Sequence, residues 1–178
     1  MSLFLLEIAP QQPSKDEAGQ IIERVSGALG ADDVAAEFIE SQVTADHAQV
    51  FVIVEADSAE AITPAVESAV AERAKVTGPD PVRLVGAELE DIKKLKKNAD
   101  YLVEWDIPAE ITMDQYLARK KANSPKYAEV PEVSFLRTYV REDTVKCLCF
   151  YDAPDEDAVT RARAAVSTPI DRLHKLDA

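Results

Sequence analysis

Apolar and polar positions follow the same pattern in two stretches of the chain. Phe135 to Val159 (FLRTYVREDTVKCLCFYDAPDEDAV) is typical of a two-stranded hairpin that leads directly into a helix. Moved back by 97 positions, the pattern falls on Phe38 to Ile62 (FIESQVTADHAQVFVIVEADSAEAI), with the apolar positions, the hairpin tip and the acidic helix start in register. The pattern therefore predicts a tandem duplication, although few letters are identical between the two stretches.

The elements around each hairpin have the same predicted order. In the first half they are strand 3–9, helix 14–30 with a capping box of Ser14 and Glu17, strands 38–44 and 49–55, helix 58–76, and strand 82–87. In the second half they are strand 101–107, helix 112–122 with a capping box of Thr112 and Gln115, strands 133–141 and 145–152, a helix from Asp155, and strand 172–176. Each half thus has the order β-α-β-β-α-β.

This order predicts an α+β protein made of two ferredoxin-like sandwiches, each an antiparallel sheet with both helices on one face. The charged, helix-prone segment between the halves favours a connecting helix over a flexible tether. The predicted domains are residues 1–90 for the first repeat, 91–99 for the linker helix and 100–178 for the second repeat.

Side-chain alternation sorts the strand residues of each repeat onto two faces. In the second repeat, the face predicted to lie under the helices collects Val103, Trp105, Leu136, Val140, Leu148 and Phe150. The open face of the second repeat collects Leu102, Glu104, Asp106, Phe135, Arg137, Tyr139, Cys147, Cys149 and Tyr151. The open face of the first repeat collects Leu5, Glu7, Phe38, Glu40, Gln42, Val50, Val52 and Val54. Open faces this apolar need a cover, so the two sheets are expected to pack together as a pseudo-dimeric α+β barrel with a pocket between them.

The polar and aromatic members of the open faces are the candidate ligand-binding residues: Glu104, Asp106, Arg137, Tyr139, Cys149, Tyr151, Glu7, Glu40 and Gln42. Glu40 occupies the position in the first repeat that Arg137 occupies in the second. Equivalent positions lie close together near a twofold axis, which predicts an ion pair between these two side chains. The alternative is that Arg137 pairs with Glu104 in its own sheet.

Composition excludes several classes of partner. The formal net charge of −13 argues against nucleic acid and against anionic membranes, because both require a basic surface. The apolar run Leu3 to Ile8 has no basic residue before it and is much shorter than the roughly 20 residues of a membrane span, so a cytoplasmic protein is expected. Cys147 and Cys149 lie two apart on one strand, where the geometry does not suit a disulfide, and a reducing compartment fits them.

Three short segments of the second half resemble a known family. They are Tyr101 to Pro108 (YLVEWDIP), Thr138 to Val140 (TYV) and Cys149 to Pro154 (CFYDAP). They are similar to the corresponding segments of a bacterial family of small ferredoxin-like proteins of unknown function, related to a nickel-binding protein. The resemblance covers roughly residues 100 to 178 and reaches the first half only through the internal repeat. It implies the ferredoxin-like fold, association of two such units, and nickel as a cofactor.

The residues themselves offer few ligands for nickel, which prefers a converging set of imidazole, thiolate and carboxylate groups. His47 is predicted at a hairpin tip and His174 on the last strand, where each can face solvent. Cys147 and Cys149 form a C-x-C pair that could chelate, but such cysteines are more often small apolar strand residues. The first half has valines at the equivalent places, so a symmetric metal site is excluded.

The sequence therefore predicts a protein that binds a small molecule or a divalent metal ion between its two sheets, with further association into a homo-oligomer left open. The alternative is a cofactor-independent barrel enzyme of the isomerase or oxygenase type, with Glu104 or Asp106 as the base and Arg137 or Tyr139 holding an anionic oxygen. A third interpretation is a paired scaffold without a pocket. The sequence contains no glycine-rich phosphate loop, nucleophile elbow or EF-hand motif.

Overall fold

The computed structural model describes residues 1–95 and 97–177, which form two compact α+β units. Unit 1 comprises residues 1–82 and 90–95 together with Asp177, and unit 2 comprises residues 83–89 and 97–176. The mixed α+β class predicted from the sequence is confirmed. None of the helices in the described part of the chain is long and apolar enough to cross a membrane.

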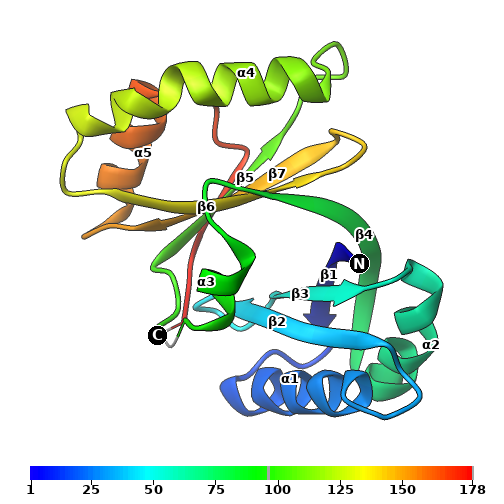
Figure 1. Ribbon diagram of the computed structural model, residues 1–178. Coiled ribbons are helices and arrows are strands. Elements are labelled where there is room, and N and C mark those ends of the chain that lie inside the picture. Colours follow the sequence, from blue (N-terminus) through cyan, green and yellow to red (C-terminus); the bar gives the residue numbers. More distant parts are fainter. Residues whose placement is uncertain (96, 178) are drawn as a thin grey trace. The chain divides into compact units, whose positions relative to one another are not determined.

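Unit 1 is a four-stranded antiparallel sheet with two helices (Figure 1). Its strands run in the order β2-β3-β1-β4, with β1 at Ser2–Pro10, β2 at Ala36–Val43, β3 at Val50–Ala56 and β4 at Ala74–Val85. Its two α-helices are α1 (Lys15–Leu29) and α2 (Ala59–Val70), and the short 3-10 helix η1 (Ala71–Arg73) follows α2. Strand β4 and the short helix α3 (Leu89–Lys93) each contribute residues to both units.

The helices of unit 1 begin at the residues that the sequence predicts. Ser14 precedes α1 and its hydroxyl accepts a hydrogen bond from the backbone N–H of Glu17, and Ser58 caps α2 in the same way. Gly30 ends α1. Both helices cover one face of the sheet, where Ile21 and Ile62 are fully buried in a common core with alternate strand residues.

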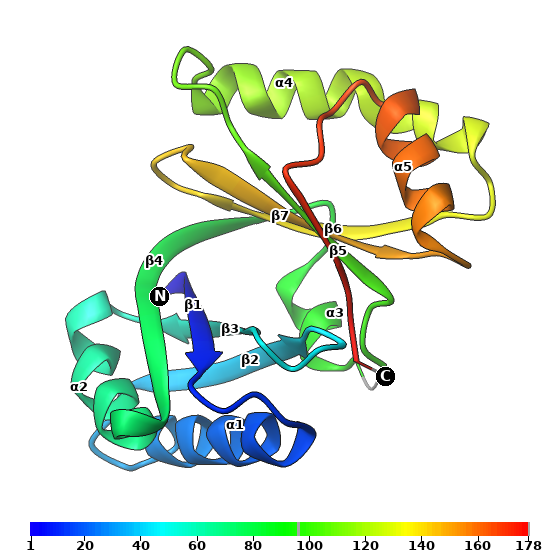
Figure 2. The ribbon, with the colours of Figure 1, turned by 180° about the vertical axis from the view of Figure 1, so that it is seen from behind.

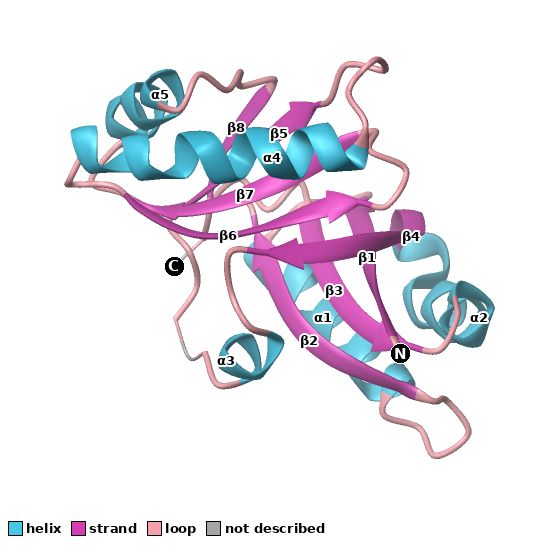
Figure 3. Cartoon of the chain, turned by 45° about the horizontal axis from the view of Figure 1, so that its top comes forward, coloured by secondary structure: helices cyan, strands magenta, loops and turns pink. Residues whose placement is uncertain are grey.

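Unit 2 repeats this arrangement. Its sheet runs from the end of β4 through β6 (Ser134–Arg141), β7 (Lys146–Asp152) and β5 (Tyr101–Asp106) to β8 (Arg172–Lys175), all antiparallel where pairs are assigned (Figures 2 and 3). Helices α4 (Met113–Asn123) and α5 (Glu156–Ala165), with the 3-10 helix η2 (Ser124–Glu129), cover one face. Thr112 and Gln115 form the predicted capping box of α4, and Asp155 caps α5.

The two hairpins share a local irregularity as well as an element order. In β2 the pairing with β3 shifts between Phe38 and Glu40, and in β6 the pairing with β7 shifts between Phe135 and Arg137. These bulges fall at positions that correspond after the shift of 97 residues. A bulge places one extra residue in its strand and is a specific structural feature. The shared bulge supports the internal repeat, whose origin by duplication stays a prediction.

The boundary between α2 and the last strand of unit 1 differs from the prediction. The sequence favoured a helix continuing to residue 76 and a strand from residue 82, but α2 ends at Val70 and β4 begins at Ala74. Pairing with β1 explains the difference, because Ala74 and Val76 lie opposite Pro10 and Ile8 in a ladder. Backbone pairing thus outweighs the helix propensity of this segment.

The assignment of residues to sheet faces was wrong for β3 and β7, and also for Phe38 and Phe135, which precede the bulges of β2 and β6. Residues opposite one another across a ladder share a face, and Val103 lies opposite Cys149 while Leu102 lies opposite Phe150. Phe135, Cys147, Cys149, Tyr151, Phe38, Val50, Val52 and Val54 therefore lie on the helix-covered faces, and Leu148 and Phe150 lie on the opposite face. The prediction assumed that odd-numbered and even-numbered residues keep their faces through each hairpin. The turn and the bulge each change which of the two sets lies on a given face.

The predicted linker helix is shorter than expected. Helical structure is assigned to Leu89–Lys93 within the segment, and residue 96 lies outside the described residues. The domain boundaries at residues 90 and 99, and the packing of one sheet on the other, stay predictions.

Candidate functional site

Unit 2 holds two groups of polar side chains on opposite faces of its sheet. One is an ionic cluster around Glu104 on β5. The other is a pocket beneath helix α4, on the face that the helices cover. The sequence-based candidates are divided between these groups and a third set on unit 1.

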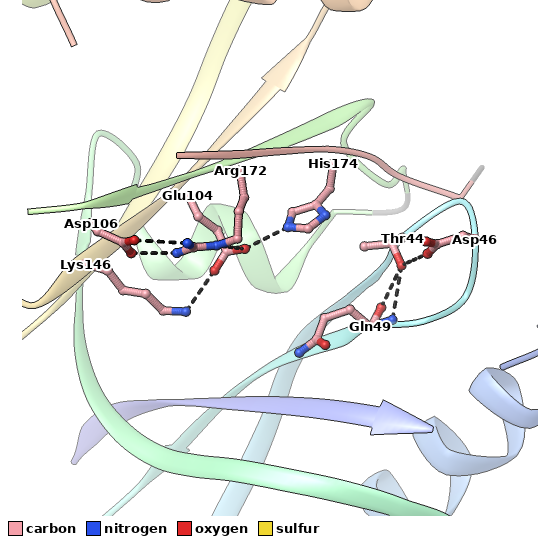
Figure 4. A network of polar contacts seen from close by, with 8 residues as sticks. All are labelled: Thr44, Asp46, Gln49, Glu104, Asp106, Lys146, Arg172 and His174. Carbon is pink, nitrogen blue, oxygen red and sulfur yellow. Dashed lines mark hydrogen bonds and ion pairs between the residues drawn. The ribbon is translucent and has the colours of Figure 1, made fainter. Parts of the chain in front are cut away.

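Glu104 is the centre of the ionic cluster, which is built from β5, β7 and β8 (Figure 4). The Glu104 side chain is only 5% exposed, and its Oε1 accepts a hydrogen bond from Lys146 Nζ at 2.8 Å. Its Oε2 accepts one from Arg172 Nε at 2.9 Å and lies 2.7 Å from His174 Nε2. Arg172 also donates two hydrogen bonds to Asp106, at 3.0 and 2.6 Å. Both oxygens of the Glu104 carboxylate are therefore occupied by protein groups.

These contacts determine the protonation of the two carboxylates. Burial acts to raise the pKa of Glu104, but hydrogen bonds from His174, Lys146 and Arg172 outweigh it and hold that pKa at about 2. The hydrogen bond from Arg172 likewise lowers the pKa of Asp106. Carboxylates with such low pKa values are weak bases near neutral pH, so the geometry favours a structural role for Glu104 over general-base catalysis.

Arg137 and Tyr139 lie on the same face of the sheet as Glu104. The Arg137 guanidinium carbon is 4.8 Å from the ring centroid of Phe150, and the Tyr139 ring meets the same ring edge-on at 5.8 Å. Both residues are buried, at 3% and 1% exposure. The structure thus keeps Arg137 and Tyr139 together as the sequence predicts, but Cys149 lies on the other face.

The candidates of the first repeat lie in unit 1. Gln42 is 3% exposed, and its side-chain amide donates to Glu40 Oε1 at 3.2 Å. Glu7 pairs with Phe51 in the ladder between β1 and β3. The ion pair between Glu40 and Arg137 stays a prediction, and so does a pocket between the two sheets.

His47 lies at the β2–β3 hairpin tip, as expected. Its Nε2 is 3.2 Å from Asp177 Oδ2. Nearby in the same turn, the Thr44 hydroxyl donates to Asp46 Oδ1 at 2.7 Å and accepts from the backbone N–H of Gln49 at 3.1 Å (Figure 4). These contacts stabilise the turn, which gives His47 a structural role there.

The pocket of unit 2 lies among α4, η2, α5 and the helix-covered face of β5 and β7. Its empty volume is about 360 Å³, including the part open to solvent. Trp105, Tyr116 and Tyr127 supply an aromatic lining. The Tyr116 residue is 3% exposed, and its hydroxyl has no hydrogen-bond partner among the described residues.

Three cations line this pocket: Arg119 and Lys120 from α4 and Arg163 from α5. None of the described residues that line it is acidic. Arg163 is 2% exposed and donates to the Tyr151 hydroxyl at 3.1 Å and to the Pro169 carbonyl at 2.6 Å. Its Nε has no partner within the described part of the chain. A buried guanidinium without a carboxylate is rare because its charge is left uncompensated.

The two cysteines form part of the same pocket wall. The Sγ atoms of Cys147 and Cys149 are 3.9 Å apart, and the Thr138 hydroxyl donates to Cys149 Sγ at 3.1 Å. Hydrogen bonding from Cys147, assisted by Lys120, Arg163 and Thr138, lowers the pKa of Cys149. The same thiol contact and burial raise the pKa of Cys147. Of the two thiols, Cys149 therefore has the lower pKa.

The sequence analysis missed the cations of this pocket. Arg163 follows Val159 by four positions and Ala162 by one, so it falls on the buried stripe of α5. An arginine on the apolar face of an amphipathic helix is the signal that could have identified it. Arg119 and Lys120 gave no such signal, because α4 is polar over most of its surface.

Solved structures define the class of fold. A protein provisionally named as a chlorite dismutase, TA0507, is 12% identical and aligns over 100% of this chain and 96% of its own, with a TM-score of 0.55. A protein of Fusobacterium nucleatum provisionally named as a monooxygenase is 11% identical over 98% of this chain and 90% of its own, with a TM-score of 0.54. At such identities the likeness shows the fold alone, and these neighbours are ferredoxin-like α+β proteins.

The second half of the chain also matches the sequence model of one family. Residues 101–176 match the sequence model of a family described as "Nickel responsive protein SCO4226-like". This confirms the resemblance found in the sequence. The crystallised SCO4226 of Streptomyces coelicolor A3(2) is 19% identical over 45% of this chain and 98% of its own, with a TM-score of 0.39. No curated protein matches the sequence.

The described residues do not fit a nickel ion. No group of three or more histidine, cysteine, aspartate or glutamate side chains is placed among them to hold a metal. Glu104 and His174 are adjacent, but Lys146 and Arg172 already occupy the carboxylate. The two thiols offer only two donors, and the side chains around them are cationic. Nickel needs a larger converging set of ligands with compensating negative charge.

We therefore expect isothermal titration of the chain with nickel, cobalt and zinc to show no binding tighter than about millimolar. The physical reason is the small number of free donors and the positive charge beside them. Cys149→Ala and His174→Ala serve as controls, because each removes one of the available donors. Micromolar nickel binding that either substitution abolishes would contradict the expectation and restore the metal site implied by the family resemblance.

Proposed function

We propose that this protein binds a small organic anion, with an aromatic carboxylate as the preferred class, in the pocket of unit 2 beneath α4. The observation that carries the proposal is Arg163. Its guanidinium is buried at the pocket, has no carboxylate partner in the described part of the chain, and has one N–H without an acceptor. A ligand carboxylate would supply the missing charge and the missing acceptor.

The surroundings of Arg163 support an anionic ligand. Arg119 and Lys120 add two positive charges at the pocket wall, and acidic side chains are absent from its described lining. This local charge contrasts with the formal net charge of −13 for the whole chain. Cations gathered in a partly enclosed, low-dielectric space attract an anion more strongly than the same cations in water.

The remaining lining indicates an aromatic ligand. Trp105, Tyr116 and Tyr127 present ring surface, and the Tyr116 hydroxyl is a free hydrogen-bond donor among the described residues. Small-molecule pockets typically combine such an apolar lining with a few polar groups that fix orientation. The three rings and the few polar groups of this lining favour a compound with a single aromatic ring.

Trp105 is the only tryptophan of the chain and lies in the pocket wall, so its fluorescence provides a direct binding assay. We expect benzoate to change this fluorescence and to bind more tightly than acetate, because it adds ring contacts. Benzyl alcohol, which has the ring without the charge, should bind at least about tenfold more weakly than benzoate, since a hydrogen bond to a charged group contributes about 1.5 to 3 kcal/mol.

Lys120→Gln is expected to weaken benzoate binding by about tenfold, because it removes one of the three cations of the lining. Lys121→Gln is the matched control: it makes the same chemical change one position later on α4, at an exposed residue that does not line the pocket. Equal affinity of the Lys120 and Lys121 variants, or equal binding of benzoate and benzyl alcohol, would refute the proposal.

Catalysis is the second candidate function, since two proteins with a similar fold are provisionally named as a chlorite dismutase and a monooxygenase. The sequence suggested Glu104 or Asp106 as the base, but the partners of Glu104 hold its pKa at about 2, and the hydrogen bond from Arg172 lowers the pKa of Asp106. The ligand-binding function therefore has the better support from the described residues. It does not depend on how the two units pack.

A further inference from the structure

We propose that Cys149 is a reactive thiol that reduces small hydroperoxides, forming a sulfenate whose negative charge is held by the pocket cations. This activity goes beyond the binding of an organic anion, although it uses the same pocket. Three features carry it: the access that the pocket gives to the sulfur, the donors directed at the sulfur, and the buried guanidinium of Arg163.

Access to the sulfur is selective. Cys149 is 1% exposed, but it lines the pocket, part of which is open to solvent. Hydrogen peroxide can enter such a space, whereas a bulky hydroperoxide meets the rings of Trp105 and Tyr127. Reactive cysteines are found in partly accessible, electropositive surroundings, and buried structural cysteines in apolar ones. The pocket matches the first description.

The donors around Cys149 favour its thiolate. The Thr138 hydroxyl, on the neighbouring strand β6, donates to Cys149 Sγ at 3.1 Å, and Cys147 Sγ is 3.9 Å away. Lys120 and Arg163 line the same pocket. Hydrogen bonding from Cys147, with help from these cations and Thr138, lowers the pKa of Cys149. The Arg163 Nε–H has no acceptor among the described residues and can donate to a new anionic partner.

The chemical step balances without a bound cofactor. The Cys149 thiolate attacks the terminal oxygen of the hydroperoxide, so that an S–O bond forms and the O–O bond breaks. Sulfur gives up two electrons, and the departing hydroxide or alkoxide takes the proton of the new S–OH group. The products are water or an alcohol and the Cys149 sulfenate, which is the first step of cysteine oxidation. The negatively charged sulfenate oxygen then provides an anionic partner for Arg163 inside the pocket.

Dimedone trapping and peptide mass spectrometry test the proposal. The chain is treated with hydrogen peroxide at pH 7, and sulfenate is measured at Cys147 and Cys149 separately. We expect Cys149 to react about fivefold faster in the folded Cys147→Ser variant than in the same variant unfolded in guanidinium. An ordinary thiol is only a few per cent ionised at pH 7, but a thiolate of low pKa is also less nucleophilic, which limits the gain.

Thr138→Val tests the hydroxyl donor with a side chain of the same shape. We expect this variant to slow sulfenate formation at Cys149 by about threefold while circular dichroism shows an unchanged fold. Thr160→Val, on the exposed surface of α5, is the matched control and should leave the rate unchanged. The proposal is overturned if Cys147 is the residue oxidised, if folding does not accelerate Cys149, or if Thr138→Val has no effect.

The two proposals can fail separately. Thr138→Val should retain benzoate binding in the Trp105 fluorescence assay, because Thr138 donates to Cys149 but does not itself line the pocket. Benzoate binding without sulfenate formation would leave the anion site in place and remove the peroxide chemistry. Sulfenate formation without benzoate binding would support the peroxide chemistry and contradict the anion site.

Discussion

Glu104→Gln is expected to destabilise the protein by about 3 kcal/mol near neutral pH. The Glu104 side chain is 5% exposed and is contacted by Lys146, Arg172 and His174. The substitution leaves these groups around a neutral amide, and breaking a buried ion pair from one side is strongly destabilising. For a chain of this length the melting temperature should fall by about 6 to 12 °C, as measured by calorimetry.

The same variant predicts a pH dependence with a defined sign. The pKa of Glu104 is about 2 in the folded protein and near its ordinary value of 4.5 in the unfolded chain. The unfolded state therefore binds more protons between these values, and the stabilisation is complete above about pH 5 and lost as the pH falls toward 2. We expect the wild type and Glu104→Gln to differ in urea unfolding by about 3 kcal/mol at pH 7 and to converge near pH 2.

Asp106→Asn is the control for this prediction. Asp106 lies on the same strand and pairs with the same arginine, but its side chain is 52% exposed. Exposed ion pairs contribute at most about 1 kcal/mol, so its loss should be small. If Glu104→Gln unfolds within about 0.5 kcal/mol of the wild type, the buried cluster is not the stabilising feature described here.

Arg163→Met is expected to weaken benzoate binding strongly while changing the stability little. The ligand loses its buried guanidinium partner, which should weaken binding by at least about tenfold, from the 1.5 to 3 kcal/mol of a charged hydrogen bond. The folded protein loses an unpaired buried charge and gains an apolar side chain of similar length. Such replacements are often neutral or stabilising, although the freed Pro169 carbonyl opposes the gain.

Fluorescence titration of Trp105 and urea unfolding measure the two effects on the same variant. Arg161→Met, two positions earlier on α5 with a side chain that is 51% exposed, should leave both nearly unchanged. A loss of more than about 4 kcal/mol in Arg163→Met would show that Arg163 is a structural cation. Unchanged benzoate affinity would show that the anion site lies elsewhere.

The order of elements and several of their boundaries could be predicted from the sequence because local signals determine them. Ser14, Thr112 and Asp155 each begin the helix that the sequence assigns to them, and Gly30 ends α1. The hairpin strands were placed within a few residues. These features depend on contacts between residues close in sequence, which single-chain patterns record.

The faces of the strands and the composition of the pocket could not be predicted in this way. The register of a hairpin depends on its turn and on any bulge, and a change of one residue moves every later side chain to the other side of the sheet. The sequence therefore grouped Cys149 with Arg137, although Cys149 lies under the helices. The pocket depends on α4 and α5 meeting the sheet, and that contact joins residues far apart in sequence.

The bulge in β6 places two side chains of the same short segment on opposite faces of the sheet. Phe135 and Arg137 are two positions apart and would share a side in a regular strand. With one residue inserted, the Phe135 ring stacks on Tyr127 beneath the helices while the Arg137 guanidinium lies over Phe150 on the reverse side. Phe38 and Glu40 are separated in the same manner in unit 1. Deleting one residue at either bulge would move the side chains on one side of the deletion to the opposite face of the sheet. An aromatic ring and a charged group would then lie on the same face.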